Sequence, residues 1–164
     1  MHFSKKLSVT LDPQSKAKSF VTLQNSNEKM DLLVSYHSNS IKQYAVEIKK
    51  QKKEESKKEQ QEVTQTFGEI ASHKEPVRGV CMAANDSMFA TNSFDSVKVW
   101  SVDLFMYSQK NKLEVQCKQS LEEQNVLSMC ILPGNKFIVL GTKEGQVMLY
   151  DLNQNTIVQR LQSH

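Results

Sequence analysis

The chain has 164 residues, of which 38% are hydrophobic and 24% are charged, and its formal net charge at pH 7 is +3. No run of about eighteen apolar residues occurs, which excludes a membrane-spanning helix, and the N-terminus lacks the apolar segment of a secretory signal. Six lysines and four glutamates fall between Lys49 and Glu62, so the basic character belongs mostly to one segment. We therefore expect an intracellular protein without a membrane partner.

Short runs of β-branched and aromatic residues, separated by Asn, Asp, Gly, Ser and Pro, extend through the rest of the chain. This texture is typical of many short antiparallel strands. In chain order, the expected strands are Lys5–Leu11; then Lys18–Gln24, Leu32–Tyr36, Ile41–Glu47 and Val63–Ile70; then Val77–Ala84, Met88–Asn92, Ser96–Val102 and Leu113–Gln119; and finally Val126–Leu132, Lys136–Gly141, Gln146–Leu152 and Thr156–Leu161.

Three of these expected hairpins align with almost no gaps. They are LLVSYHSNSIKQYAV (Leu32–Val46), MFATNSFDSVKVWSV (Met88–Val102) and IVLGTKEGQVMLYDL (Ile138–Leu152). Their aromatic residues Tyr44, Trp100 and Tyr150 are 56 and 50 residues apart, a spacing typical of repeat architectures. A small residue also recurs, at Ser35, Thr91 and Gly141.

Repeated units of four short antiparallel strands favour the blades of a β-propeller over a sandwich or a solenoid. We expect an outer strand of a preceding blade and its connection in residues 1–17. Blades follow in residues 18–73, with a charged insertion at 49–62, in residues 74–121, and in residues 122–164, cut at the start of the next blade. Because three blades do not close a ring, the prediction is an all-β fragment of an incomplete propeller, an interior piece of a longer protein.

Two of the expected third strands resemble the WD-repeat family. The matching segments are SVKVWSVD (Ser96–Asp103) and VMLYDLN (Val147–Asn153), with Ser72-His73 resembling the family's Gly-His position. The resemblance implies a hydrogen-bonded network within a blade. The implied network residues are His73, Ser93, Asp95 and Trp100, with Tyr150 and Asp151 at the dipeptide position of the following blade. Asp95 stands two residues before Val97 where the family leaves three, which implies a strained or partial network.

Within that family, Val126–His164 is similar to the tandem-propeller subunit of the UTP-B subcomplex of the small-subunit processome, and the segment GTKEGQVMLYDL is moderately specific for this resemblance. This resemblance implies a non-catalytic scaffold in the nucleus and nucleolus that supports pre-rRNA processing and maturation of the small ribosomal subunit. The implied partners are other processome subunits, pre-rRNA and guide snoRNA. The alternative is a WD-repeat adaptor of an unrelated pathway, such as a ubiquitin-ligase receptor or a trafficking scaffold.

Residue patterns for catalysis or metal binding are weak in this chain. The three cysteines, Cys81, Cys117 and Cys130, lack metal-ligand spacing and are expected to be reduced and buried. The four histidines are not paired with one another or with cysteine at ligand spacing. Gly141–Gly145 lacks the spacing of a phosphate-binding loop. We expect no catalytic residue, metal, cofactor or small-molecule substrate.

Two interpretations of the segment Lys49–Glu62 remain open. It is either a solvated loop or a contact with RNA phosphates made through its lysines. Those lysines are Lys49, Lys50, Lys52, Lys53, Lys57 and Lys58. The interleaved glutamates lower the local positive field, and the segment has no aromatic residue that can stack on a base. These features favour the solvated loop.

Overall fold

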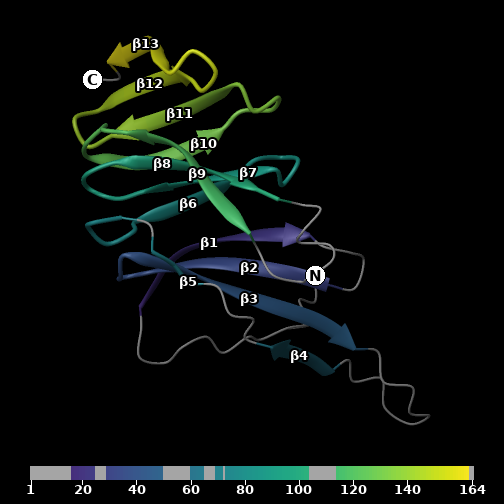
Figure 1. Ribbon diagram of the computed structural model, residues 1–164. Helices are drawn as coiled ribbons and strands as arrows, with labels where there is room; N and C mark the ends of the chain where they lie inside the picture. Colours follow the sequence, from purple (N-terminus) through teal and green to yellow (C-terminus); the bar gives the residue numbers. More distant parts are fainter. Residues whose placement is uncertain are drawn as a thin grey trace, which may run out of the picture.

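The computed structural model describes residues 16–24, 29–49, 60–64, 69–71, 73–103 and 114–162. These residues form strands and turns without any helix, and the strands build three antiparallel sheets stacked on one another (Figure 1). The expected all-β, partial-propeller architecture is therefore confirmed. The expected strand Lys5–Leu11 lies outside the described residues, and the exact division of the chain into blades stays a prediction.

The first sheet contains one strand more than expected. Its strands are β1 (Ala17–Gln24), β2 (Lys29–Tyr36), β3 (Ser40–Lys49), β4 (Gln60–Thr64) and β5 (Glu69–Ala71). The prediction of a single fourth strand, Val63–Ile70, is wrong. β3 is 10 residues long, which leaves room for two partner strands on the same side. β4 pairs with one end of β3, Ala45–Lys49, and β5 pairs with the other end, Ser40–Lys42.

The charged insertion is consequently shorter than the predicted 49–62. Lys49 is the last residue of β3 and pairs with Gln60, the first residue of β4. The interpretation of the whole segment as a solvated loop is therefore wrong at both ends. Residues 50–59, with five of the six lysines named above, lie outside the described residues.

The second and third sheets are four-stranded meanders, each with its strands in chain order. The second contains β6 (Gly79–Met82), β7 (Met88–Asn92), β8 (Val97–Val102) and β9 (Val115–Leu121). The third contains β10 (Val126–Ile131), β11 (Phe137–Thr142), β12 (Gln146–Asp151) and β13 (Thr156–Gln162). β6 begins later than expected, since the Val77 N–H donates to Ser38 O of the first sheet (3.0 Å).

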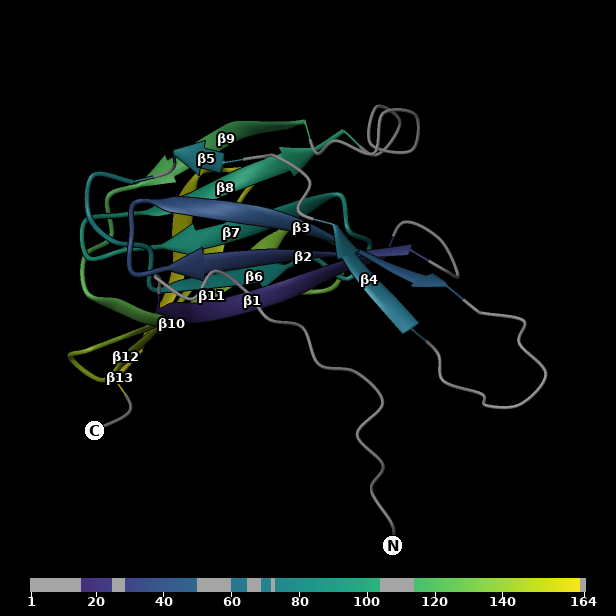
Figure 2. The same ribbon diagram turned by 90° about the horizontal axis from the view of Figure 1, so that it is seen from below.

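Apolar side chains fill the two layers between the sheets, and the first strands β1, β6 and β10 lie next to one another (Figure 2). Leu23 and Leu33 of the first sheet pack with Phe89 of the second, and all three are fully buried. Ile138 and Leu140 of the third sheet pack on the second in the same way. Burial of each such side chain contributes about 1.5–3 kcal/mol.

The repeated aromatic residue explains why the sheets stack as they do. Trp100 lies in the layer between the first and second sheets, stacked on Phe89 with ring centroids 6.0 Å apart. Tyr150 lies in the layer between the second and third sheets. Tyr44 packs instead with Tyr36 in a separate cluster of the first sheet. In two of the three repeats, the aromatic residue is thus one of the contacts that a sheet makes with the preceding sheet.

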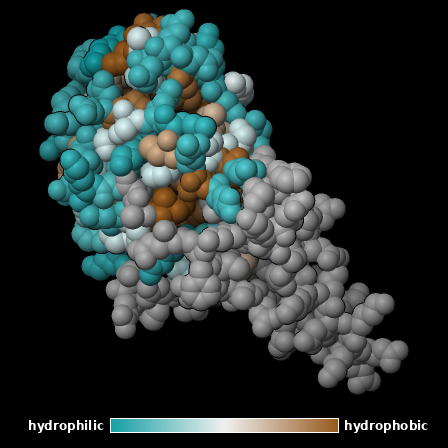
Figure 3. Space-filling model, in the orientation of Figure 1, coloured by the Kyte–Doolittle hydropathy of each residue, from teal (hydrophilic) through white to brown (hydrophobic). Residues whose placement is uncertain are grey.

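The predicted burial of the cysteines is wrong at two positions. Cys81 is half-buried against the core between the second and third sheets, whereas Cys117 and Cys130 are exposed. Cys117 lies on β9, at the edge of its sheet. Cys130 alternates with the buried Ile131 along β10, so it belongs to the face of the third sheet that points away from the second. Other exposed apolar residues also lie in the third sheet: Leu127, Val147, Val158 and Leu161. In the view of Figure 3, hydrophobic areas lie among a largely hydrophilic surface.

Candidate functional site

A chain of hydrogen-bonding side chains runs through the second sheet. The Trp100 Nε1–H donates to Thr91 Oγ1 (3.0 Å), and Thr91 Oγ1 lies 2.8 Å from His73 Nε2. On the other side of the imidazole, His73 Nδ1 lies 3.0 Å from Ser96 Oγ, whose hydroxyl donates to Asp95 Oδ2 (3.2 Å). The structure therefore brings His73, Asp95 and Trp100 into one network, together with two residues that the sequence did not indicate.

The carboxylate at one end of this chain sets the direction of the hydrogen bonds that lead to it. An indole nitrogen can only donate and an ionised carboxylate can only accept. Ser96 donates its one hydroxyl proton to Asp95, so it accepts from a proton on His73 Nδ1. His73 Nε2 is then an acceptor and receives the hydroxyl proton of Thr91. Each donor is used once, so His73 is held as its Nδ1–H tautomer.

Burial keeps this histidine neutral. His73 has no exposed side-chain surface, and desolvation, helped by the positive charge of Lys98, lowers its pKa from 6.5 to about 4. Asp95 opposes this effect, but its Oδ1 lies 3.8 Å from His73 Nδ1 and its side chain is 33% exposed. A neutral imidazole suits the network, because a protonated one would have no acceptor at Nε2 for the Thr91 hydroxyl.

Ser93 and Asp95 close the β7–β8 turn beside this chain. The Ser93 hydroxyl donates to Asp95 Oδ1, and the Asp95 N–H donates back to Ser93 Oγ (3.2 Å). Desolvation acts to raise the pKa of Asp95, but hydrogen bonds from Ser93 and Ser96 outweigh it and hold the pKa below the ordinary value. The carboxylate thus fixes the turn as well as the end of the chain.

The third sheet has a different arrangement at the aligned positions. The Tyr150 hydroxyl donates to Asn155 Oδ1. Asp151 accepts the N–H groups of Asn153 (2.8 Å) and Gln154 (3.0 Å), which closes the β12–β13 turn and lowers the pKa of its carboxyl group. These residues stabilise a local turn, and the structure does not join them to the network around His73.

The connections between sheets gather at one end of the strands, together with the turns β2–β3, β7–β8 and β11–β12; we call this the connector end. Residues 73–78 lead from β5 to β6, and residues 122–125 from β9 to β10. Through His73, the first connector bonds to the β7–β8 turn of the sheet that it enters. In the second connector, Asn125 does the same: its Nδ2 donates to Glu144 Oε1 (3.0 Å) in the β11–β12 turn, and its O accepts from the Lys143 N–H (3.0 Å).

Sequence reasoning missed Thr91, Ser96 and Asn125. Thr91 occupies the repeat column that also holds Ser35 and Gly141, and its hydroxyl was the available signal. Lys49 ends β3 near the edge strand β4, and its side chain is not described. The structure therefore does not place the proposed RNA-contacting lysines.

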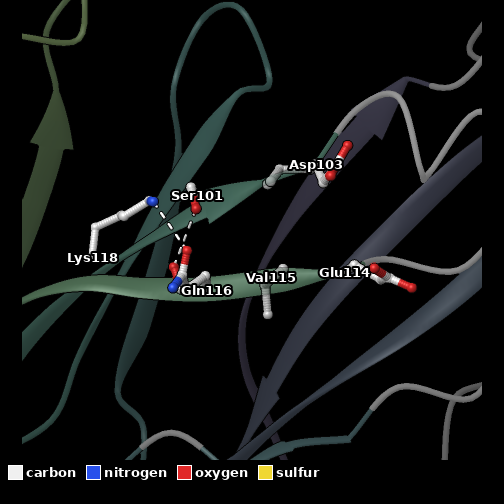
Figure 4. A pocket seen from close by; sticks show the side chains of 7 residues that line it. Ser101, Asp103, Glu114, Val115, Gln116 and Lys118 are labelled. Atoms are coloured by element: carbon white, nitrogen blue, oxygen red, sulfur yellow. Dashed lines mark hydrogen bonds between the residues drawn. The ribbon is translucent and has the colours of Figure 1, made fainter.

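A surface pocket of about 520 Å³ opens at the far ends of β8 and β9 (Figure 4). In it Lys118 Nζ donates to Gln116 Oε1 (3.0 Å), while the Asp103 N–H donates to Glu114 O (3.1 Å). Its lining includes the two carboxylates but no histidine or cysteine among the described residues. In this pocket the Ser101 hydroxyl donates to the backbone Gln116 O (3.4 Å). No group of three or more metal-ligating side chains occurs in the described part of the chain. Nor does that part contain a helix suited to crossing a membrane.

No protein-family model matches the chain. It is 26% identical over 95 residues to WD repeat-containing protein 3 of Mus musculus, which covers 58% of this chain and 9% of that protein. It is 28% identical over 103 residues to the WD repeat-containing protein 3 homolog of Dictyostelium discoideum, covering 63% of this chain and 10% of that protein. These similarities support the WD-repeat family. A further match, over more of the chain, is to U3 small nucleolar RNA-associated protein 12 of Saccharomyces cerevisiae: 24% identity over 147 residues, 90% of this chain and 14% of that protein. The chain thus spans about a tenth of the length of these WD-repeat relatives.

Proposed function

We propose that this chain is part of a non-catalytic WD-repeat scaffold of the small-subunit processome, acting in the nucleolus in pre-rRNA processing and small-subunit maturation. The observation that carries the proposal is the match to U3 small nucleolar RNA-associated protein 12, which extends over 90% of the chain. The name of that relative places it with a small nucleolar RNA. The stacked sheets support a scaffold role, because they hold many turns rigidly at one end for contact with partners.

The partners in this proposal are other processome subunits, with pre-rRNA and its guide snoRNA. Lys49 at the end of β3 and the five lysines that follow it in sequence would add phosphate contacts, whose strength falls as salt concentration rises. Replacement of all six lysines by glutamine should then reduce crosslinking of the protein to RNA and leave its protein partners in place. Unchanged RNA crosslinking would return the segment to the role of a solvated loop.

The decisive experiment is affinity purification of the tagged full-length protein, with and without nuclease, followed by identification of proteins and RNAs. Recovery of processome subunits with pre-rRNA and the U3 snoRNA would support the proposal. Subunits that remain after nuclease treatment bind through protein contacts, and subunits that disappear are held by RNA. Recovery of ubiquitin-ligase or vesicle-coat components, without ribosome-assembly factors, would overturn it.

A further inference from the structure

An exposed aromatic ring and an arginine lie together at the connector end. Phe94, in the β7–β8 turn, is 45% exposed although it is a large apolar residue. Arg78, in the connector that enters β6, places its guanidinium over the Phe94 ring, with Cζ 3.0 Å from the ring centroid. A guanidinium in this position makes a cation–π contact and covers one face of the ring.

The backbone on both sides of this pair is held by hydrogen bonds. The Arg78 N–H donates to Asn92 O (2.8 Å), and Phe94 O accepts from the Asn125 N–H (3.3 Å). Ser93 closes the turn that carries Phe94, because its N–H donates to Ser96 O (3.0 Å). A pair held in this way loses little conformational freedom when a partner binds, which favours affinity.

Within the described part of the chain, the guanidinium of Arg78 keeps its hydrogen-bonding capacity for a partner. Among the described residues, no carboxylate lies within the 4.0 Å of an ion pair with it. Asp95, next to Phe94 in sequence, is already engaged by the hydroxyl groups of Ser93 and Ser96. A planar guanidinium with five N–H donors binds carboxylates and phosphates through two parallel hydrogen bonds.

The other charges of the connector end favour a carboxylate over a phosphate backbone. Exposed Lys74 and Lys143 are offset by their neighbours in sequence, Glu75 and Glu144, which are also exposed. Binding of nucleic acid draws its affinity from several cations acting together, and the alternating signs here do not provide them. Arginine and exposed aromatic residues are, by contrast, enriched in protein–protein interfaces.

We propose that Arg78 and Phe94 bind a segment of a partner protein that carries a carboxylate next to an apolar side chain. The carboxylate accepts two hydrogen bonds from the guanidinium, and the apolar side chain covers the open face of the ring. This inference rests on the proposed scaffold role, because it needs a protein partner, but it does not depend on the pathway in which the scaffold acts.

A photo-crosslinking amino acid, p-benzoylphenylalanine, placed at position 94 of the full-length protein tests the surface directly in cells. The expected product is a crosslink to a protein segment with Asp or Glu within a few residues of the crosslinked position. A crosslink to RNA, or to protein segments without a nearby carboxylate, or no crosslink at all, would overturn the inference.

The crosslinked segment, made as a synthetic peptide, then allows a quantitative test by titration. Arg78→Ala should weaken binding by about ten- to a hundredfold, as expected for loss of hydrogen bonds to a charged group. Arg78→Lys should weaken peptide binding less than Arg78→Ala does. A peptide in which Asn or Gln replaces the Asp or Glu should bind the wild-type protein as weakly as the unmodified peptide binds Arg78→Ala. Arg160→Ala and Phe20→Ala remove an exposed arginine on β13 and an exposed phenylalanine on β1, and should leave the affinity unchanged. Equal affinity of wild type and Arg78→Ala would overturn the inference.

The two proposals fail in distinguishable ways. If the wild-type protein recovers processome subunits but gives no acidic crosslink at position 94, the binding pair is wrong and the scaffold role stands. If an acidic segment of a protein from another complex is crosslinked, the pair is supported and the processome assignment is wrong.

Discussion

The burial of a neutral histidine against the second sheet makes the stability of this protein depend on pH. The pKa of His73 is lowered from 6.5 to about 4 on folding, so between these values the unfolded chain binds a proton that the folded chain excludes. The stabilisation is complete above pH 6.5 and is lost as pH falls toward 4. The full difference is on the order of 3 kcal/mol, and about 2 kcal/mol of it should be lost between pH 7 and pH 5.

Urea unfolding at a series of pH values measures this loss. Trp100 is the single tryptophan of the chain and stacks on Phe89 in the folded state, so its fluorescence follows the unfolding of the second sheet. His73→Gln keeps a donor and an acceptor but removes the titrating group, and should abolish most of the loss between pH 7 and pH 5. His37→Gln, at an exposed histidine of the β2–β3 turn, should keep the wild-type pH dependence. If His73→Gln loses as much stability as the wild type over this range, His73 is not the buried neutral group described here.

Three further substitutions or labels test other contacts. Trp100→Ala should lower the free energy of unfolding by about 3–5 kcal/mol, measured by urea unfolding followed by circular dichroism. Trp100→Phe loses only the donor and part of the ring, and should cost about 1–3 kcal/mol. A cost of Trp100→Ala below about 1 kcal/mol would contradict its placement between two sheets. Gly79→Ala should destabilise the protein by about 1–3 kcal/mol, because a Cβ at this position would lie 2.7 Å from Asn92 Oδ1. Asn92 cannot easily move away, since it is buried and hydrogen-bonded to the third sheet. A thermal unfolding curve that matches the wild type would refute this packing. A maleimide at pH 8 should label the two exposed cysteines well before Cys81, since burial raises the pKa of the Cys81 thiol to about 11; equal labelling rates would show that Cys81 is accessible.

The sheets could be predicted from the sequence because each repeat contains the residue pattern of its own strands and turns. Strand alternation and turn residues recur in each unit, and the aligned Trp100 and Tyr150 occupy equivalent layers between sheets. The split of the fourth strand of the first sheet into β4 and β5 could not be predicted, since it depends on the length of β3. The exposure of Cys130 depends on which face of the third sheet is covered, and strand alternation alone does not determine that.

The network around His73 was only partly predictable, for a different reason. His73, Asp95 and Trp100 followed from a resemblance, but the groups that connect them, Thr91 and Ser96, depend on contacts between a connector and the next sheet. Thr91 was noticed as a small residue of the repeat, and only the structure shows that its hydroxyl group is what matters there. Asn125 has no counterpart in the sequence pattern, because an amide in the second connector replaces the imidazole of the first.

The difference between these two connectors bears on where the protein can bind a partner. The contact of His73 with the β7–β8 turn is buried, so competition from water is small and its hydrogen bonds are strengthened by the low dielectric. The contact of Asn125 with Glu144 in the β11–β12 turn is exposed, and water can replace it at little cost. The β7–β8 turn is therefore held more firmly than its equivalent in the third sheet. Phe94 lies on that turn, so the binding pair that we propose it forms with Arg78 sits on the more firmly held of these two turns, and the buried network beside it would support recognition without touching the partner.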